Sequence, residues 1–109
     1  MNKIRVALAD DHDIVREGIK LMINNFGSFE IVCDAIDGRD LIDKINRLEK
    51  HPDIVLTDIS MPVMNGFETI RYLSKKAPSI RCIALSVSND FNTVFTHIST
   101  IIYIMSRSK

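Results

Sequence analysis

The side chains best suited to chemistry are polar groups at the ends of runs of apolar residues. They are two adjacent carboxylates, a third carboxylate and a hydroxyl: Asp10, Asp11, Asp58 and Ser86. The runs are rich in Ile, Val and Leu, which is typical of strands buried on both faces of a parallel sheet. Because ligands of an open parallel sheet bind beyond the carboxyl ends of its strands, these side chains are expected to converge at one edge.

Such a group of side chains predicts a metal-dependent site. Three neighbouring carboxylates repel one another unless a cation joins them, and oxygen donors suit a hard divalent ion, best Mg²⁺. A later apolar run is followed by Arg107 and Lys109, which would add a positive charge. A metal ion and a cation stabilise the charge that develops in phosphoryl transfer. Since a carboxylate can form an acyl phosphate, Asp58 is the candidate nucleophile.

Five strand-like segments would position these groups. We predict them at 4–9, 31–35, 54–58, 80–85 and 101–105. Strands that alternate with helices predict right-handed βαβ units, and so an α/β fold with a doubly wound, five-stranded parallel sheet. The chain ends just after the fifth strand, so we expect this sheet to lack a fifth helix.

Helices are predicted between the strands by apolar residues spaced three or four apart. The four stripes are Val15, Ile19, Met22 and Phe26, then Leu41, Ile45 and Leu48, then Phe67, Ile70 and Leu73, and last Phe91, Val94, Phe95 and Ile98. Two helix starts are also predicted from polar residues three apart, Asp37 with Asp40 and Asn65 with Glu68.

Length and composition exclude several classes of protein. The 109 residues suffice for one domain. Fourteen basic residues balance fourteen acidic ones, so the formal net charge is 0, which disfavours nonspecific binding to nucleic acid. No apolar run is long enough to span a membrane, and the residues behind Met1 do not match a secretory leader. Cys33 and Cys82 form no Cys-x-x-Cys pair, which favours reduced thiols in the cytoplasm.

Each candidate also has a plainer interpretation. Asp11 or Asp13 would then only cap the helix that begins near Ile14, and Ser86 would belong to a turn. The histidines share no ligand spacing and are interpreted as surface or loop residues: His12, His51 and His97.

Four stretches of the sequence are similar to a known family. They are Leu-Ala-Asp-Asp-His at 8–12, Val-Arg-Glu-Gly at 15–18, Asp-Ile-Val-Leu-Thr-Asp-Ile-Ser-Met-Pro-Val-Met-Asn-Gly at 53–66 and Ala-Leu-Ser at 84–86. Together they resemble a response-regulator receiver domain, in particular the subgroup that carries a LuxR-type helix-turn-helix output domain. The resemblance implies a flavodoxin-like sheet with the strand order 2-1-3-4-5.

Carried over by position, the resemblance implies a role for each candidate residue. Asp58 would accept a phosphoryl group from a sensor histidine kinase. Asp11 and Asp58 would hold Mg²⁺ together with the backbone carbonyl of Ser60, while Asp10 would act through bound water. Ser86 would close onto a phosphoryl oxygen, and this movement would switch the surface that partners contact.

The carboxyl-terminal stretch departs from the family pattern. The family has a Gly-Ala-x-Gly-Tyr-like stretch before its lysine, whereas residues 99–109 read Ser-Thr-Ile-Ile-Tyr-Ile-Met-Ser-Arg-Ser-Lys. Counted from Ser86, the family's lysine falls at Ser108, one position before Lys109. A one-residue shift at a strand end turns a side chain elsewhere. Lys109 and Arg107 therefore remain as alternative cations, and both also fit a solvated terminus.

The sequence thus predicts one receiver domain over residues 1–109, truncated or altered at its carboxyl terminus and without an output domain. It would be a cytoplasmic phosphoacceptor and no enzyme beyond slow self-dephosphorylation. Its expected partners are a sensor histidine kinase and a second copy of the chain, with DNA reached only through an output domain that this chain lacks, and no membrane. Two rival hypotheses are a decayed receiver that acts as a phosphorylation-independent interaction module and a small Mg²⁺-dependent aspartyl phosphatase.

Overall fold

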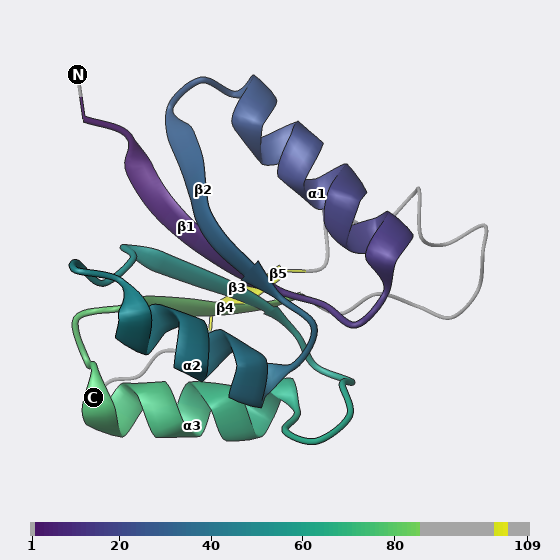
Figure 1. Cartoon of the computed structure of the whole chain (residues 1–109), viewed down its shortest axis with the longest axis vertical. Coiled ribbons are helices and arrows are strands. Elements are labelled where there is room, and N and C mark those ends of the chain that lie inside the picture. Colours follow the sequence, from purple (N-terminus) through teal and green to yellow (C-terminus); the bar gives the residue numbers. More distant parts are fainter. Residues whose placement is uncertain (1, 86–101, 105–109) are drawn as a thin grey trace.

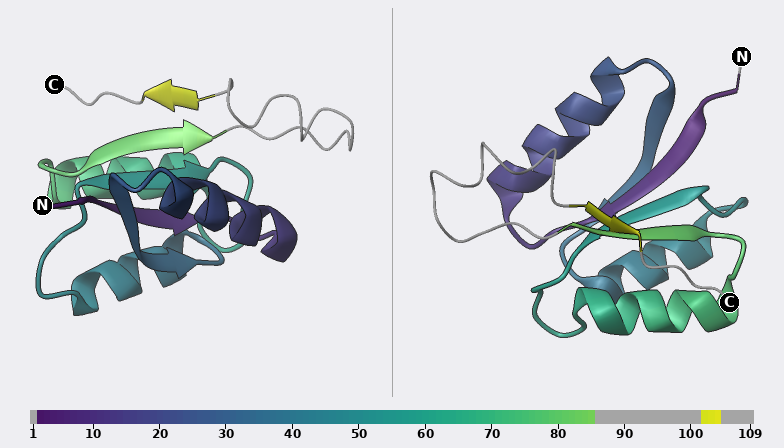
Figure 2. Two further views of the ribbon diagram at one scale, coloured as in Figure 1. Left: turned by 90° about the horizontal axis from the view of Figure 1, so that it is seen from above. Right: turned by 180° about the vertical axis from the view of Figure 1, so that it is seen from behind.

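The computed structural model describes residues 2–85 and the backbone of residues 102–104. These residues form a twisted sheet with helices on both faces (Figure 1; Figure 2). The strands are β1 (Ile4–Ala9), β2 (Phe29–Ala35), β3 (Ile54–Asp58), β4 (Arg81–Leu85) and β5 (Ile102–Ile104). Their order across the sheet is β2-β1-β3-β4-β5. The first four predicted strands and their order are confirmed.

The segment at residues 102–104 differs from the prediction. β1 to β4 run parallel to one another, but β5 pairs with β4 in the antiparallel direction, with Ile102 opposite Leu85. The expected five-stranded parallel sheet is therefore not confirmed. The prediction rested on an apolar run, which indicates burial but carries no information on strand direction. The helix predicted from the stripe at 91–98 lies outside the described residues.

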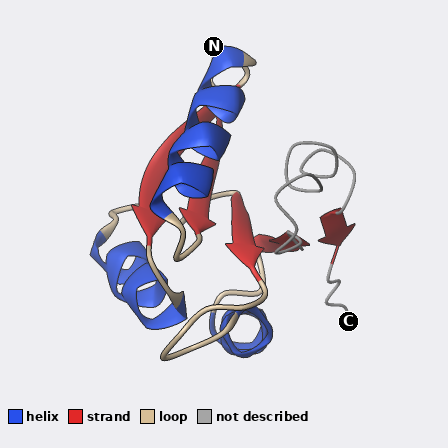
Figure 3. Cartoon of the chain, turned by 90° about the vertical axis from the view of Figure 1, so that its right-hand side faces the viewer, coloured by secondary structure: helices blue, strands red, loops and turns tan. Residues whose placement is uncertain are grey.

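Three helices connect the parallel strands, namely α1 (Asp13–Asn25), α2 (Gly38–Arg47) and α3 (Gly66–Lys76). α1 covers one face of the sheet, and α2 and α3 lie side by side on the other (Figure 1; Figure 3). Helices on both faces of a parallel sheet are what right-handed crossovers produce when the order of the strands reverses. Here the reversal falls at β1, which lies between β2 and β3.

The core has one part on each face of the sheet. The larger part holds Ala7 and Ala9 of β1 against the apolar sides of α2 and α3, and the smaller part holds Leu8 of β1 against Ile19 of α1. Successive residues of β1 therefore point into opposite halves of the core. This arrangement confirms that the strand is buried on both faces, as its unbroken apolar run predicts.

Two predicted helix starts are confirmed by their caps. The Asp37 carboxylate accepts a hydrogen bond from the Asp40 backbone N–H at 2.8 Å and begins α2. Asn65 begins α3 with a complete capping box, in which its side chain accepts from the Glu68 N–H and the Glu68 carboxylate accepts from the Asn65 N–H, both at 2.9 Å. These caps fix where the loops after β2 and β3 end.

Candidate functional site

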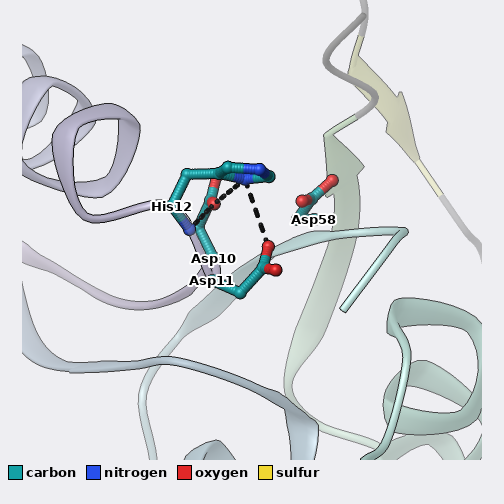
Figure 4. A group of neighbouring side chains, drawn as sticks. All are labelled: Asp10, Asp11, His12 and Asp58. Atoms are coloured by element: carbon teal, nitrogen blue, oxygen red, sulfur yellow. Dashed lines mark hydrogen bonds and ion pairs between the residues drawn. The ribbon is translucent and has the colours of Figure 1, made fainter. Parts of the chain in front are cut away.

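Three of the predicted carboxylates meet at the carboxyl edge of the sheet. β1 and β3 are neighbours in register, with Ala9 opposite Thr57, so Asp10 and Asp58 follow at the same edge. Both residues are buried, Asp10 with 1 % and Asp58 with 6 % of its surface exposed. One donor atom from each of Asp10, Asp11, His12 and Asp58 lies within 4.8 Å of all the others. Figure 4 shows the four side chains turned toward a common space.

Asp10 is held in place through its backbone and through one carboxylate oxygen. Its N–H donates to the carbonyl of Ala35 at 3.0 Å, and its own carbonyl accepts from Nη1 of Arg16 at 2.8 Å. Its Oδ1 accepts from the His12 backbone N–H at 2.8 Å. The second oxygen, Oδ2, is buried and has no hydrogen-bond partner among the described residues. A buried carboxylate oxygen without a partner is costly, and a bound cation would satisfy it.

Asp58 is positioned by the tight loop that connects β3 to α3. Its Oδ1 accepts from the Ile59 N–H at 2.8 Å, and the Ile59 carbonyl accepts from the Gly66 N–H at 2.9 Å. Gly66 stands so close that a Cβ atom there would overlap the carbonyl oxygen of Asp58. The glycine at the end of the Met-Pro-Val-Met-Asn-Gly stretch is therefore required for α3 to begin against the Asp58 backbone.

Two carboxyl groups of the site, those of Asp58 and Asp10, have raised pKa values. Burial, and then the charge of Asp10, raise the pKa of Asp58 to about 6, although hydrogen bonds from the Ile59 and Ser60 backbone oppose the shift. Burial also raises the pKa of Asp10, against the hydrogen bonds and charge of His12. Burial removes the water that would stabilise the ionised forms, and the negative charges of neighbouring carboxylates oppose ionisation further. The donor set is thus suited to a hard divalent cation.

His12 is a member of the site that the sequence did not assign to it. Its Nδ1 lies 3.2 Å from Oδ1 of Asp10 and 3.1 Å from Oδ1 of Asp11, while its side chain is 60 % exposed. The prediction that His12 lies at the surface is confirmed. It did not include the contacts of His12 with Asp10 and Asp11. The signal in the sequence was its place directly after Asp10 and Asp11, because a third residue at a strand end still lies at the same edge.

The plainer interpretation of these acids as helix caps is not supported by α1. The cap residue of this helix is His12, and no side chain supplies a cap hydrogen bond there. Asp13 lies in the first turn and pairs with Arg16 at 2.8 Å. Asp11 is therefore left at the site, with 30 % of its side chain exposed.

Comparison with known proteins decides the family. Residues 6–102 match the family described as the response regulator receiver domain. The chain belongs to this family. The resemblance seen in its sequence motifs is thereby confirmed.

Longer regulatory proteins are among its relatives. The transcriptional regulatory protein DegU of Brevibacillus brevis is 36 % identical over 97 residues, which are 89 % of this chain and 40 % of DegU. The chain spans about two fifths of the length of this relative.

Two solved structures are similar in fold and in sequence. A two-component response regulator of the LuxR family from Aurantimonas sp. SI85-9A1 aligns with a TM-score of 0.72 and 27 % identity, over 81 % of this chain and 61 % of that one. RcsB from Salmonella enterica serovar Typhimurium, bound to promoter rprA with the phosphomimetic BeF3−, aligns with a TM-score of 0.71 and 30 % identity, over 82 % and 45 %. The receiver domain is thus similar to regulators of the LuxR type.

Of the remaining predicted site residues, the structure describes only Ser60. Ser60 lies two residues beyond Asp58 and is exposed. Ser86 directly follows β4, and it lies outside the described residues, as do Arg107 and Lys109. The roles expected for these residues stay predictions.

Two further expectations concern the rest of the receiver domain. Cys33 on β2 forms no disulfide and is only half-buried, and Cys82 lies on another strand, β4, where it is buried. Among residues 2–85 and 102–104, no helix has the length and apolar character needed to cross a bilayer.

Proposed function

We propose that this receiver domain is the phosphoacceptor of a two-component response regulator and takes a phosphoryl group onto Asp58. The observation that carries the proposal is the meeting of Asp58 with Asp10 and Asp11 at one edge of the sheet, with a donor atom of each within 4.8 Å. The family of the chain supports the same function. The donor of the phosphoryl group would be the phosphohistidine of a sensor histidine kinase.

Asp11 and Asp58, with Asp10 beside them, are the residues that would hold Mg²⁺, and the backbone carbonyl of Ser60 is the proposed neutral ligand. When bound, Mg²⁺ would neutralise the negative charge that develops on the phosphoryl oxygens. Asp10 is the residue that the protein fixes most firmly, through its backbone and Oδ1. Its unpartnered Oδ2 is the oxygen that most needs a positive charge nearby.

Asp58 would act as the nucleophile in a direct displacement. A carboxylate oxygen attacks the phosphorus, a P–O bond forms as the P–N bond of phosphohistidine breaks, and the imidazole keeps the electron pair and takes a proton from solvent. With a pKa of about 6, Asp58 is mostly ionised near neutral pH. The hydrogen bond from the Ile59 N–H to Oδ1 orients the carboxylate for this attack.

A hydroxyl group and a cation would bind the new phosphoryl group. It adds a charge of about −1.5 to −2 and three acceptor oxygens. Ser86 is the proposed hydroxyl donor to it. Lys109, or Arg107 in its place, stays the proposed cation, although the antiparallel β5 leads the chain away from this edge of the sheet. Their movement would change the surface that a partner contacts.

The output of the switch would be control of transcription. This proposal is supported by DegU, which is called a transcriptional regulatory protein, and by RcsB, which was solved on promoter DNA. DNA would be bound only by an output domain, and a second copy of the receiver is a further proposed partner. Cys33, which forms no disulfide, supports a cytoplasmic location for the domain.

The test is incubation with acetyl phosphate and Mg²⁺, followed by intact mass measurement. We expect one phosphoryl adduct per chain, none after chelation of Mg²⁺, and loss of the adduct under mild base. Asp58→Asn removes the acceptor and should give no adduct. Asp34→Asn is the matched control, since it changes a carboxylate one strand away from the site and should leave the adduct in place.

Two results would contradict the proposal and favour its rivals. A folded protein that forms no adduct would favour a phosphorylation-independent interaction module. Repeated turnover of a phosphomonoester, in place of stoichiometric labelling, would favour an aspartyl phosphatase.

A further inference from the structure

A polar pocket lies at the edge of the sheet opposite to Asp58. It has a volume of about 560 Å³, and it is lined by Asn2, Lys3, Arg5, Glu30, Lys50 and Asp53. Arg5 and Asp53 directly precede residues that pair between β1 and β3, so the pocket lies at the amino ends of these strands. Pockets that bind small molecules measure about 300 to 1,000 Å³. This pocket is therefore large enough for a small ligand, and its polar lining suits a charged one.

The guanidinium group of Arg5 is held in place at this pocket by one nitrogen. Its Nη1 donates to the carbonyl of Lys50 at 2.9 Å and to the carbonyl of His51 at 2.6 Å. Its Nε and Nη2 have no hydrogen-bond partner among the described residues. These two nitrogens form the edge of a guanidinium that binds phosphate or carboxylate through two parallel hydrogen bonds. The protein thus orients Arg5 and leaves its bidentate edge open to an anion.

The cations of the pocket are not neutralised by the carboxylates beside them. In the described part of the chain, the ion pairs of lysine and arginine involve Arg16, Lys20 and Lys44. Lys3, Arg5 and Lys50 form no ion pair with any described residue, although Glu30 and Asp53 line the same pocket. Asp53 is turned to the backbone instead, because its Oδ2 accepts from the Arg5 N–H at 2.8 Å. The three positive charges are therefore available to an anion from solvent.

The backbone around the pocket is already fixed by hydrogen bonds. The Asp53 N–H donates to the Arg5 carbonyl at 2.8 Å, and the Asp53 carbonyl accepts from the Arg81 N–H at 3.0 Å. On the other side of β1, the Ile4 N–H donates to the Ser28 carbonyl at 2.9 Å. A ligand that binds to a preformed pocket loses little affinity to the ordering of the protein.

We propose that this pocket binds a small phosphate ester that carries hydroxyl groups, such as glycerol phosphate or a sugar phosphate. The open edge of Arg5 binds the phosphate group, and the ammonium groups of Lys3 and Lys50 stand beside it. Glu30 accepts a hydrogen bond from a hydroxyl group of the ligand and repels a second phosphate. The inference goes beyond the proposed function, because the pocket lies at the opposite edge from Asp58 and takes no part in phosphoryl transfer.

The first test is a titration of the protein with glycerol phosphate, followed by ¹⁵N NMR of the backbone amides and of Arg5 Nε. EDTA is present, so that no divalent ion draws the phosphate to the carboxylates at the other edge. We expect saturable shifts of Arg5 Nε and of the amides at 2–5 and 50–53, with none at 10–12. Glycerol, which has the hydroxyl groups but no phosphate, should cause no shifts. Absence of saturable shifts at Arg5 with glycerol phosphate would overturn the proposal.

The second test compares three lysine variants that each lose one positive charge. Lys3→Gln and Lys50→Gln should each weaken the binding of glycerol phosphate by about threefold to tenfold, because each removes a charge-assisted contact. Lys75→Gln is the matched control, since Lys75 is an exposed lysine in the last turn of α3 that lies outside the pocket lining. It should bind as the wild type does. Equal weakening in all three variants would overturn the proposal, because it would indicate only a general attraction to surface cations.

The third test concerns the hydroxyl groups of the ligand. Glycerol phosphate should bind more tightly than inorganic phosphate, and Glu30→Gln should reduce this preference. Equal affinity of the wild type for both compounds would overturn the assignment to a hydroxylated ester. None of these results depends on Asp58, whose role is tested separately by the acetyl phosphate experiment.

Discussion

Two carboxylates near the carboxyl edge of the same sheet have opposite surroundings. Asp34 of β2 accepts from Nε of Arg16 at 3.0 Å and lies 3.4 Å from Nζ of Lys20. Asp58 of β3 has Asp10 and Asp11 as its charged neighbours, and its pKa is raised first by burial and then by their charges. In the described part of the chain, no lysine or arginine forms an ion pair with Asp58 or Asp10. The carboxylate of Asp34 is neutralised by the fold, whereas those of the site are left for a ligand to neutralise.

The contrast between Asp34 and Asp58 shows that carboxylates that stabilise the fold are paired with cations, whereas carboxylates of the proposed site are not. Arg16 takes part in both regions, because it binds Asp34 and Asp13 through their carboxylates and Asp10 through its backbone carbonyl. It thereby fixes the position of Asp10 without neutralising its carboxylate. A site arranged in this way is strained by charge until a cation binds, and binding then stabilises the native state.

The largest expected effect tests the packing beneath Asp58. Gly66→Ala should lower the free energy of unfolding by about 3 kcal/mol or more, because the new Cβ overlaps the Asp58 carbonyl and the backbone must shift. Gly18→Ala is the control in α1, where a Cβ meets nothing within 4 Å. It should raise stability by about 0.5 to 1 kcal/mol. Urea unfolding measures both, and equal effects would contradict the close approach at Gly66.

The next effect tests the excess negative charge of the site. Asp58→Asn should raise the free energy of unfolding by about 2 to 3 kcal/mol near pH 8 without Mg²⁺, because a pKa raised to about 6 means that ionised Asp58 destabilises the fold. The native state binds the extra proton between about pH 4 and pH 6, so wild-type stability falls as pH rises through this window. The gain from Asp58→Asn should therefore vanish toward pH 4. A destabilised variant at pH 8 would contradict the account.

A smaller effect tests the cation that links the two regions. Arg16→Met should lower the free energy of unfolding by about 2 kcal/mol, because the Arg16 side chain is only 12 % exposed and its guanidinium binds Asp34 and the Asp10 carbonyl. Mg²⁺ affinity, measured by calorimetry on folded Arg16→Met, should also fall, since the Asp10 backbone loses a restraint. An unchanged Mg²⁺ affinity would show that Arg16 serves stability alone.

The smallest effect comes from the paired carboxylate itself. Asp34→Asn should lower stability by about 1 kcal/mol, because its ion pairs are partly exposed to solvent. The sign is opposite to that expected for Asp58→Asn, although the chemical change is the same. Thermal unfolding of both variants in one buffer without Mg²⁺ measures the contrast, and a shift of the same sign in both would remove the distinction between the two regions.

The convergence of the carboxylates at one edge of the sheet was predictable from the sequence, because it follows from two physical rules. Unbroken apolar runs imply parallel strands, and parallel strands bring the residues at their carboxyl ends to one edge. Asp10 and Asp58 are placed there by β1 and β3. The caps at Asp37 and Asn65 were also predictable, since a capping residue acts on the backbone within three residues of itself.

Features that depend on tertiary placement were not predictable in the same way. The contact of His12 with Asp10 and Asp11 depends on how the backbone turns between β1 and α1, which spacing does not reveal. Phe26 belongs to the predicted apolar stripe of α1, yet it is 65 % exposed. Phe26 is the cap residue that follows α1, and its ring packs edge-on against Phe29 with the ring centroids 6.1 Å apart, outside the smaller core around Ile19.

The most direct measurement of the central claim is the pKa of the Asp58 carboxyl group, followed by ¹³C NMR across a pH titration with and without Mg²⁺. The account predicts a pKa of about 6 in the absence of divalent ions. It also predicts a large fall in that pKa when Mg²⁺ is added, because the ion favours the charged carboxylate. A pKa at the ordinary value for aspartate that Mg²⁺ does not move would contradict it.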